Sequence, residues 1–301
     1  MSAPRGYIDP NFENPGGPND AGIIIYGYTP NFLLCVLALT LFTLALLVHT
    51  YQTLKQKTYF LLSLLFSILL EIFGYASRSL SAKKDPYNVI YFILQYFFIV
   101  TAPVFLTASI YVCLNKLIAW ARGAGYTSSK GRWLRPKLIL WGFVACDVLS
   151  TGMQVAGAAL IGKAESDEKD PATANNILLA GLAFQTFAFF IFLVVLGLLI
   201  ASLVRDIVIG SNLGGKRTFV VALYVASLLI FLRIIFRVAE TSQGVLGYLS
   251  THEAFFGALE FAPVVLAVWI LAIWHPGRCI VGERGSAVVS EVERGQKGGT
   301  G

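Results

Sequence analysis

Seven apolar segments, each long enough to cross a lipid bilayer as a helix, dominate this sequence. An α-helix needs about 20 mostly apolar residues to span the hydrocarbon core, where lipid offers its backbone no hydrogen-bond partners. The composition, 56% hydrophobic and 13% charged, agrees with such a fold. The sequence therefore predicts an all-α integral membrane protein built as a seven-transmembrane helix bundle. The predicted helices cover approximately Tyr28–Tyr51, Thr58–Leu80, Tyr87–Trp120, Pro136–Gly162, Asn176–Val204, Thr218–Gly244 and His252–Trp274.

The predicted membrane domain covers residues 28–277 and is flanked by two polar segments. Residues 1–27 and 278–301 are rich in glycine and polar residues, so we expect both to be disordered. Pro103 and Pro263 lie inside predicted spans, where proline removes a backbone donor, and are expected to kink their helices.

Lysine and arginine residues are divided unequally between the two sides of the predicted bundle. Thirteen lie on the side of the C-terminal tail and five on the other. The positive-inside rule therefore predicts an extracellular or lumenal N-terminus and a cytosolic C-terminus. The thirteen are Lys55, Lys57, Arg122, Lys130, Arg132, Arg135, Arg205, Lys216, Arg217, Arg278, Arg284, Arg294 and Lys297. The five are Arg5, Lys83, Lys84, Lys163 and Lys169.

The net charge of +6 predicts contact with the anionic cytoplasmic leaflet rather than with nucleic acid. We expect no cofactor and no metal, because His49 and His275 fall at one membrane edge and His252 at the other, about 30 Å away. All three histidines are expected to be interfacial anchors. Gly210–Lys216 has the spacing of a phosphate-binding loop, but Arg217 follows where Ser or Thr would hold magnesium, so ATP binding is not predicted.

Four of the apolar runs contain polar residues that recur at a seven-residue interval. This interval is two helical turns, so both members of each pair lie on one face. The pairs are Glu71 with Arg78, Asp147 with Gln154, Arg233 with Glu240, and Glu253 with Glu260. Tyr75, Gln95, Gln185 and Arg237 fall at similar depths, and the predicted topology brings the whole set together in the outer half of the bundle.

A charged side chain that faces lipid at the helix centre costs about 2.5–3.5 kcal/mol. The five carboxylates and three arginines of this set must therefore face one another or a watery cavity. Two interpretations stay open. One is a buried salt-bridge network that fixes helix register; the other is a polar pocket that binds a ligand, which the excess of carboxylates favours.

Motifs on six of the spans resemble a known family. They are EIFGYASR in the second span, AP-VFLTA-SIY in the third, D-VLS-TGMQ-VAG in the fourth, GLAFQ in the fifth, RIIFRVAE in the sixth and E-AFFGAL-E-FAP followed by HPG in the seventh. From about Tyr28 to Gly277 the chain resembles the fungal RTA-like, or lipid-translocating exporter, family of seven-helix proteins.

The resemblance implies resistance to toxic amphiphiles, translocation of sphingoid long-chain bases and, in one branch, movement of porphyrin or haem. It also implies the plasma membrane, with the vacuolar or another internal membrane as the alternative. A sphingoid base is an amine on an apolar chain, so we predict that Glu240, Glu253 and Glu260 hold the amine. The predicted substrate-binding residues are Glu71, Tyr75, Arg78, Gln95, Asp147, Gln154, Gln185, Arg233, Arg237, Glu240, Glu253 and Glu260. Of these, the arginines would organise the carboxylates, and Glu71 and Asp147 could carry a proton.

Three alternatives from other classes fit the sequence less well. A seven-helix receptor or lipid sensor would suit an outer polar pocket, but the third run lacks an acidic–arginine pair and the seventh lacks Asn-Pro-x-x-Tyr. A retinal protein needs a lysine in the seventh helix, which has none. A lipid-cleaving zinc hydrolase needs clustered histidines. We therefore predict a lipid transporter that is not an enzyme, with the sensor as the alternative.

Overall fold

The computed structural model describes residues 7–14, 16–123, 136–166, 172–209, 214–244 and 247–278. Within these residues, seven helical spans are long and apolar enough to cross a membrane, which confirms the predicted fold class. The helices are α1 (Phe32–Gln56), α2 (Leu62–Lys83), α3 (Val89–Gly123), α4 (Pro136–Ser166), α5 (Ala172–Ile209), α6 (Gly214–Ser242), α7 (Glu253–Phe255) and α8 (Ala262–Ile273). A short 3₁₀ turn, η1 (Tyr59–Leu61), precedes α2. A π-helical segment, η3 (Phe256–Phe261), joins α7 to α8, so these three pieces form the seventh span.

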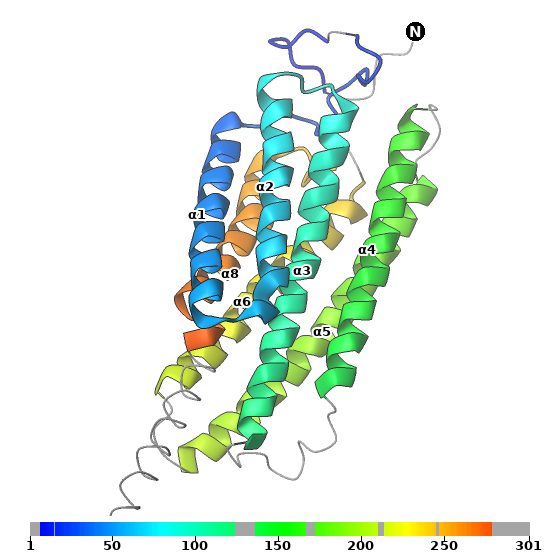
Figure 1. Ribbon diagram of the computed structural model, residues 1–301. Helices are drawn as coiled ribbons and strands as arrows, with labels where there is room; N and C mark the ends of the chain where they lie inside the picture. The colour runs from blue at the N-terminus through cyan, green and yellow to red at the C-terminus, as the bar shows by residue number, and fades with distance from the viewer. Residues whose placement is uncertain are drawn as a thin grey trace, which may run out of the picture.

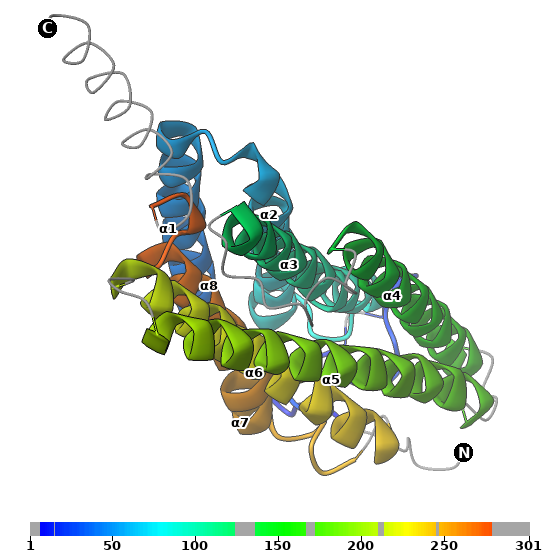
Figure 2. The same cartoon turned by 90° about the horizontal axis from the view of Figure 1, so that it is seen from below.

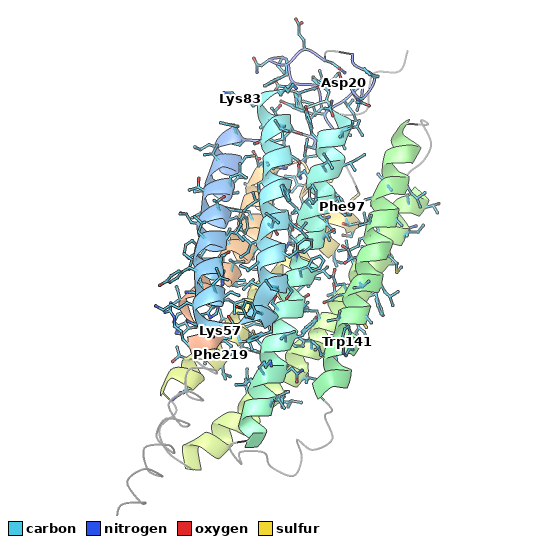
Figure 3. The ribbon with its side chains drawn as sticks, viewed as in Figure 1. Asp20, Lys57, Lys83, Phe97, Trp141 and Phe219 are labelled. Atoms are coloured by element: carbon cyan, nitrogen blue, oxygen red, sulfur yellow. The ribbon has the colours of Figure 1, made fainter. Side chains whose placement is uncertain are left out.

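The helices contact one another in a closed ring that runs α1, α2, α3, α4, α5, α6, α8 and back to α1 (Figures 1 and 2). Figure 2 shows α4 and α5 side by side as one arm of the bundle. Residues 7–27 and Lys83 lie at one end, which we call the N-terminal end, and Lys57 lies at the opposite end (Figure 3).

Aromatic and branched side chains fill the centre of the ring. Phe42 of α1, Phe192 of α5 and Phe219 of α6 are each at most 1% exposed. Trp141 of α4 and Phe97 of α3 are instead exposed on the outer surface (Figure 3), as expected for side chains that face lipid.

The helix ends follow local sequence signals. The side chain of Asn31 caps α1 by accepting a hydrogen bond from the backbone of Leu33, so the helix begins at Phe32 rather than at Tyr28. At the other end Lys57 adopts a left-handed conformation with φ of 52°, and its N–H bonds to carbonyls of the last turn.

The N-terminal segment differs from its prediction. We expected residues 1–27 to be disordered, but the described residues pack over the ends of α2 and α3 (Figure 1). Ile24 is fully buried against Tyr26 and Tyr87, and the hydroxyl of Tyr87 donates to the carbonyl of Phe12 at 3.0 Å. The hydroxyls of Tyr26 and Ser81 lie 2.9 Å apart. The prediction failed because the polar composition concealed a few aromatic and aliphatic anchors.

Residues 1–6 and most of the tail, 279–301, lie outside the described residues, as do most of the basic loops.

The histidines also correct a prediction. His49 and His275 are fully buried rather than interfacial, and their ring centroids lie 6.0 Å apart between α1 and the end of α8. The Nε2 of His49 donates to the carbonyl of Val268 at 3.1 Å. Because they pack at a helix seam, these two rings contribute to the bundle rather than to its surface. His252 remains exposed at the N-terminal end.

Candidate functional site

Among the residues that the structure describes, three arginine–glutamate pairs form a polar network toward the N-terminal end of the bundle. The first joins Arg78 of α2 to Glu253 of α7, with an Nη2–Oε1 distance of 2.7 Å. Arg78 is 1% exposed and also donates to the hydroxyl of Tyr28 at 2.8 Å and to Gln95 of α3 at 3.4 Å. Its guanidinium lies 4.1 Å from the ring centroid of Phe256, a cation–π contact. One side chain thus ties together α2, α3, the seventh span and the chain before α1.

Glu253 has a second role at the start of α1. Its two carboxylate oxygens accept a shared hydrogen bond from the backbone N–H of Asn31 at 2.9 and 3.0 Å. A negative charge at a helix N-terminus is favourable. Burial raises the pKa of Tyr28 above its ordinary value, although the positive charge of Arg78 opposes the shift, so the phenol stays protonated. Glu253 remains 20% exposed, more than any other carboxylate of the three pairs.

The second pair, Arg233 of α6 with Glu260 of η3, is the most buried of the three. The guanidinium and the carboxylate are in direct contact, and Glu260 is 1% exposed. Arg233 also donates to the backbone carbonyl of Ile99 at 2.9 Å. That carbonyl is free because the residue four positions later is Pro103, which has no N–H to donate to it. The proline inside α3 therefore creates an acceptor for the arginine of another helix.

A proline positions Glu260 as well. Pro263, near the start of α8, cannot donate to the preceding turn, and the chain before it widens into the π-helix η3. Glu260 lies in that widened turn, and its Oε2 is buried without a partner. Segments of this kind occur frequently at functional sites.

The third pair lies within α6. Arg237 contacts Glu240 at 2.8 Å, one turn further along the helix, and donates to the hydroxyl of Tyr96 in α3 at 2.8 Å. The side chains of Arg237 and Glu240 are 10% and 17% exposed. This pair joins α6 to α3 on the same side as the Arg233 bond to Ile99.

Glu71 of α2 belongs to the same region but has no salt bridge in the described part of the chain. It is 2% exposed, its Oε1 is buried without a hydrogen-bond partner, and it interacts electrostatically with Arg233 and Glu260. Tyr75, one turn later, packs in an aromatic cluster with Phe42 and Phe261. Two buried carboxylate oxygens, Glu71 Oε1 and Glu260 Oε2, are thus left without donors.

The remaining predicted residues lie elsewhere in the bundle. Asp147 of α4 contacts α3, where it bonds to Thr107 and Tyr111. Gln154 of α4 donates to Gln185 of α5 at 2.8 Å. The structure therefore separates the predicted single network into an arginine–glutamate network and two sites along α4.

Two glycines bring α4 and α5 close enough for the glutamine pair. A Cβ on Gly157 would lie 2.7 Å from the backbone nitrogen of Leu178, and one on Gly181 would lie 2.9 Å from the Cβ of Met153. Both distances are shorter than real Cβ contacts, so any larger residue would force the two helices to shift.

Sequence reasoning missed the neutral partners of the charged groups. Five uncharged residues form hydrogen bonds directly with predicted site residues: Tyr28, Asn31, Tyr96, Thr107 and Tyr111. A usable signal existed for Tyr96, because it directly follows Gln95 in an apolar run. In the residues that the structure describes, no group of three or more His, Cys, Asp or Glu side chains could hold a metal ion.

Comparison with known proteins identifies the family. Residues 64–283 match the family described as RTA1 like protein, and this range contains all three arginine–glutamate pairs. The chain belongs to this RTA1-like family. The resemblance seen in the sequence motifs is thereby confirmed.

Several named relatives are fungal proteins. The sphingoid long-chain base transporter RSB1 of Saccharomyces cerevisiae (strain Lalvin EC1118) is 29% identical over 299 residues, which cover 88% of this chain and 76% of the relative. The probable lipid transporter atnI of Emericella nidulans is 27% identical, with 92% and 72% covered. The protoporphyrin uptake protein 1 of S. cerevisiae is 26% identical, with 83% and 91% covered. No solved structure matches this chain.

Proposed function

We propose that this RTA1-like protein moves amphiphilic lipids with a cationic head group, such as sphingoid long-chain bases, from one leaflet of the membrane to the other. Two relatives are named as transporters of sphingoid bases or lipids, which supports the substrate class. The observation that carries the proposal is the pair of buried carboxylate oxygens, Glu71 Oε1 and Glu260 Oε2, that have no donor.

An amine complements these oxygens. A protonated primary amine has N–H donors but no acceptor, and both oxygens can accept a hydrogen bond from it. Buried polar atoms are normally hydrogen-bonded, so two unpartnered acceptors in one region favour a ligand that donates. The apolar chain of the same ligand would remain in lipid or between the helices.

An amine would have to compete with the arginines for the glutamates. Each of the three predicted amine-binding glutamates is paired with an arginine. An arriving amine therefore has to replace a guanidinium at Glu253 or Glu260, or add to an oxygen that the arginine leaves free. Glu253, the most exposed of the three, is the first carboxylate that a ligand from the N-terminal end would meet.

The proposal also assigns the protein an orientation, a membrane and a functional class. We place the N-terminal end outside the cell or in the lumen, the basic loops on the anionic cytoplasmic leaflet, and the protein in the plasma membrane, where it would confer resistance to toxic amphiphiles. Because the relatives are named as transporters, we assign no enzymatic activity.

Reconstitution in liposomes tests the proposal. The purified protein is inserted into vesicles with a fluorescent sphingoid base, and the appearance of the base in the opposite leaflet is followed with time. We expect movement that depends on the protein and is strongly reduced in Glu71→Gln and Glu260→Gln. Glu13→Gln makes the same chemical change at an exposed position of the N-terminal segment and should leave the rate unchanged.

Two results would contradict transport. Movement at the same rate in protein-free vesicles would rule it out for this substrate. Saturable binding without movement would make the protein a lipid sensor instead. An unchanged rate in both glutamate variants would refute the assigned site while leaving the activity intact.

A further inference from the structure

Asp147 is a buried acidic group that the arginine–glutamate network does not use. It lies on α4, is 1% exposed, and faces α3 through the hydroxyls of Thr107 and Tyr111 at 2.8 and 2.9 Å from its Oδ2. Its Oδ1 is buried and has no partner. No lysine or arginine among the described residues forms a salt bridge with it.

The hydrogen bonds around Asp147 favour a neutral carboxyl group. Three short oxygen–oxygen contacts meet here: Thr107 to the carbonyl of Val104 at 2.9 Å, Thr107 to Asp147, and Tyr111 to Asp147. Each contact needs one hydrogen, but the two hydroxyls supply only two. The carbonyl of Val104 can only accept, whereas a protonated carboxyl group can also donate. If Thr107 gives its hydrogen to Val104, the Thr107–Asp147 contact takes its hydrogen from the carboxyl group.

The neighbouring groups agree with a neutral acid. Tyr111 of α3 and Cys146 of α4 are titratable side chains beside Asp147, and neither supplies a positive charge. From α5, the rings of Phe189 and Phe192 pack on Tyr111 at centroid distances of 6.4 and 4.5 Å. An ionised carboxylate in such surroundings would be costly, and its bare Oδ1 would carry charge without any donor. In the neutral acid, Oδ1 is only an unpaired carbonyl oxygen.

We infer that Asp147 is a proton-binding site, held as a neutral carboxylic acid that donates to Thr107 while Thr107 donates to Val104. In the described conformation Asp147 is 1% exposed, so its carboxyl group has almost no contact with solvent. Release of the proton to water therefore requires a movement that exposes this side chain between α3 and α4.

The consequence for transport rests on the function proposed above. A carboxylic acid that is neutral when the helices are closed and ionised when water reaches it couples helix movement to uptake and release of one proton. Asp147 would then carry the proton that is coupled to transport, and Glu71, which lies beside the arginines, would bind the amine.

Infrared spectroscopy of the purified full-length protein in lipid nanodiscs at neutral pH tests the proton site directly. We expect a C=O stretch of a protonated carboxylic acid that is present in wild type, absent in Asp147→Asn and retained in Asp85→Asn, a matched change in the loop between α2 and α3. If the full band persists in Asp147→Asn, the inference is wrong. Thr107→Val keeps the acid but removes its acceptor and should shift the band to higher frequency, and an unshifted band would also refute the arrangement.

A second measurement separates this inference from the transport proposal. In liposomes, an imposed pH gradient should accelerate sphingoid-base movement by the wild type, whereas Asp147→Asn should move the base at one rate with or without the gradient. Gradient-independent movement by the wild type would refute coupling through Asp147. If no base moves under any condition, the transport proposal fails, and the infrared result still decides the proton site.

Discussion

Removing Glu253 should destabilise the bundle more than removing its partner Arg78, and removing both should cost much less than the sum of the two single losses. The Glu253→Gln variant leaves the Arg78 guanidinium 1% exposed and without a counter-charge. Breaking a buried ion pair in this way costs about 3–5 kcal/mol. Arg78 keeps its bond to Tyr28 and its contact with Phe256, so we expect the lower end, about 3 kcal/mol.

The opposite variant, Arg78→Met, leaves a charge that is more exposed to water. Glu253 would still accept from the backbone of Asn31 at the start of α1 and is 20% exposed, so water can solvate it. The expected cost is about 2 kcal/mol, the value for lost charged hydrogen bonds. The double variant leaves no uncompensated charge and should also lose only about 2 kcal/mol, which corresponds to a coupling of about 3 kcal/mol.

Thermal unfolding of the detergent-purified variants, followed by fluorescence-detected size exclusion after heating, measures these differences. With an unfolding entropy of about 2.1 cal/mol/K per residue, 3 kcal/mol corresponds to a Tm shift of about 5 °C for a chain of 301 residues. The reasoning fails if Glu253→Gln melts with wild type, or if the double variant loses the sum of the two single losses. Glu13→Gln controls for the loss of an exposed carboxylate.

Two further predictions concern the packing away from the network. Gly157→Ala should lower the Tm markedly and weaken the α4–α5 contact, because its Cβ would lie 2.7 Å from the backbone of Leu178; Gly152→Ala, where no atom lies within 4 Å, should not, and equal Tm values would refute the argument. Burial, and secondarily the neighbouring His49, lowers the pKa of His275 from 6.5 to about 4. Between these two pH values the unfolded chain binds a proton at His275 that the folded chain does not. The free energy of unfolding is therefore unaffected by this histidine above about pH 6.5 and decreases as the pH falls from about 6.5 to about 4. Tm measured across this range should fall less steeply for His275→Gln than for wild type, and identical slopes would refute the assignment.

The sequence was sufficient to predict the spans and the helix faces, because both depend on local periodicity. Apolar length alone identified seven spans, and the seven-residue interval correctly placed Glu71 and Arg78 on one buried face. Pairing across helices was not predictable, because it depends on how each helix is rotated. The interval grouped Glu253 with Glu260, yet the two bind Arg78 and Arg233 separately.

The least predictable feature is the way α3 serves both polar regions. Pro103 was expected only to kink the helix, but its missing N–H leaves the carbonyl of Ile99 free for Arg233. One turn beyond the same proline, Thr107 accepts from Asp147 under the proton assignment given above. Movement of α3 about Pro103 would therefore alter the contacts of Arg233 and of Asp147 together. If both proposals hold, this proline would supply an acceptor on one side and adjoin the proton site on the other, so one movement of α3 would link amine binding to proton release.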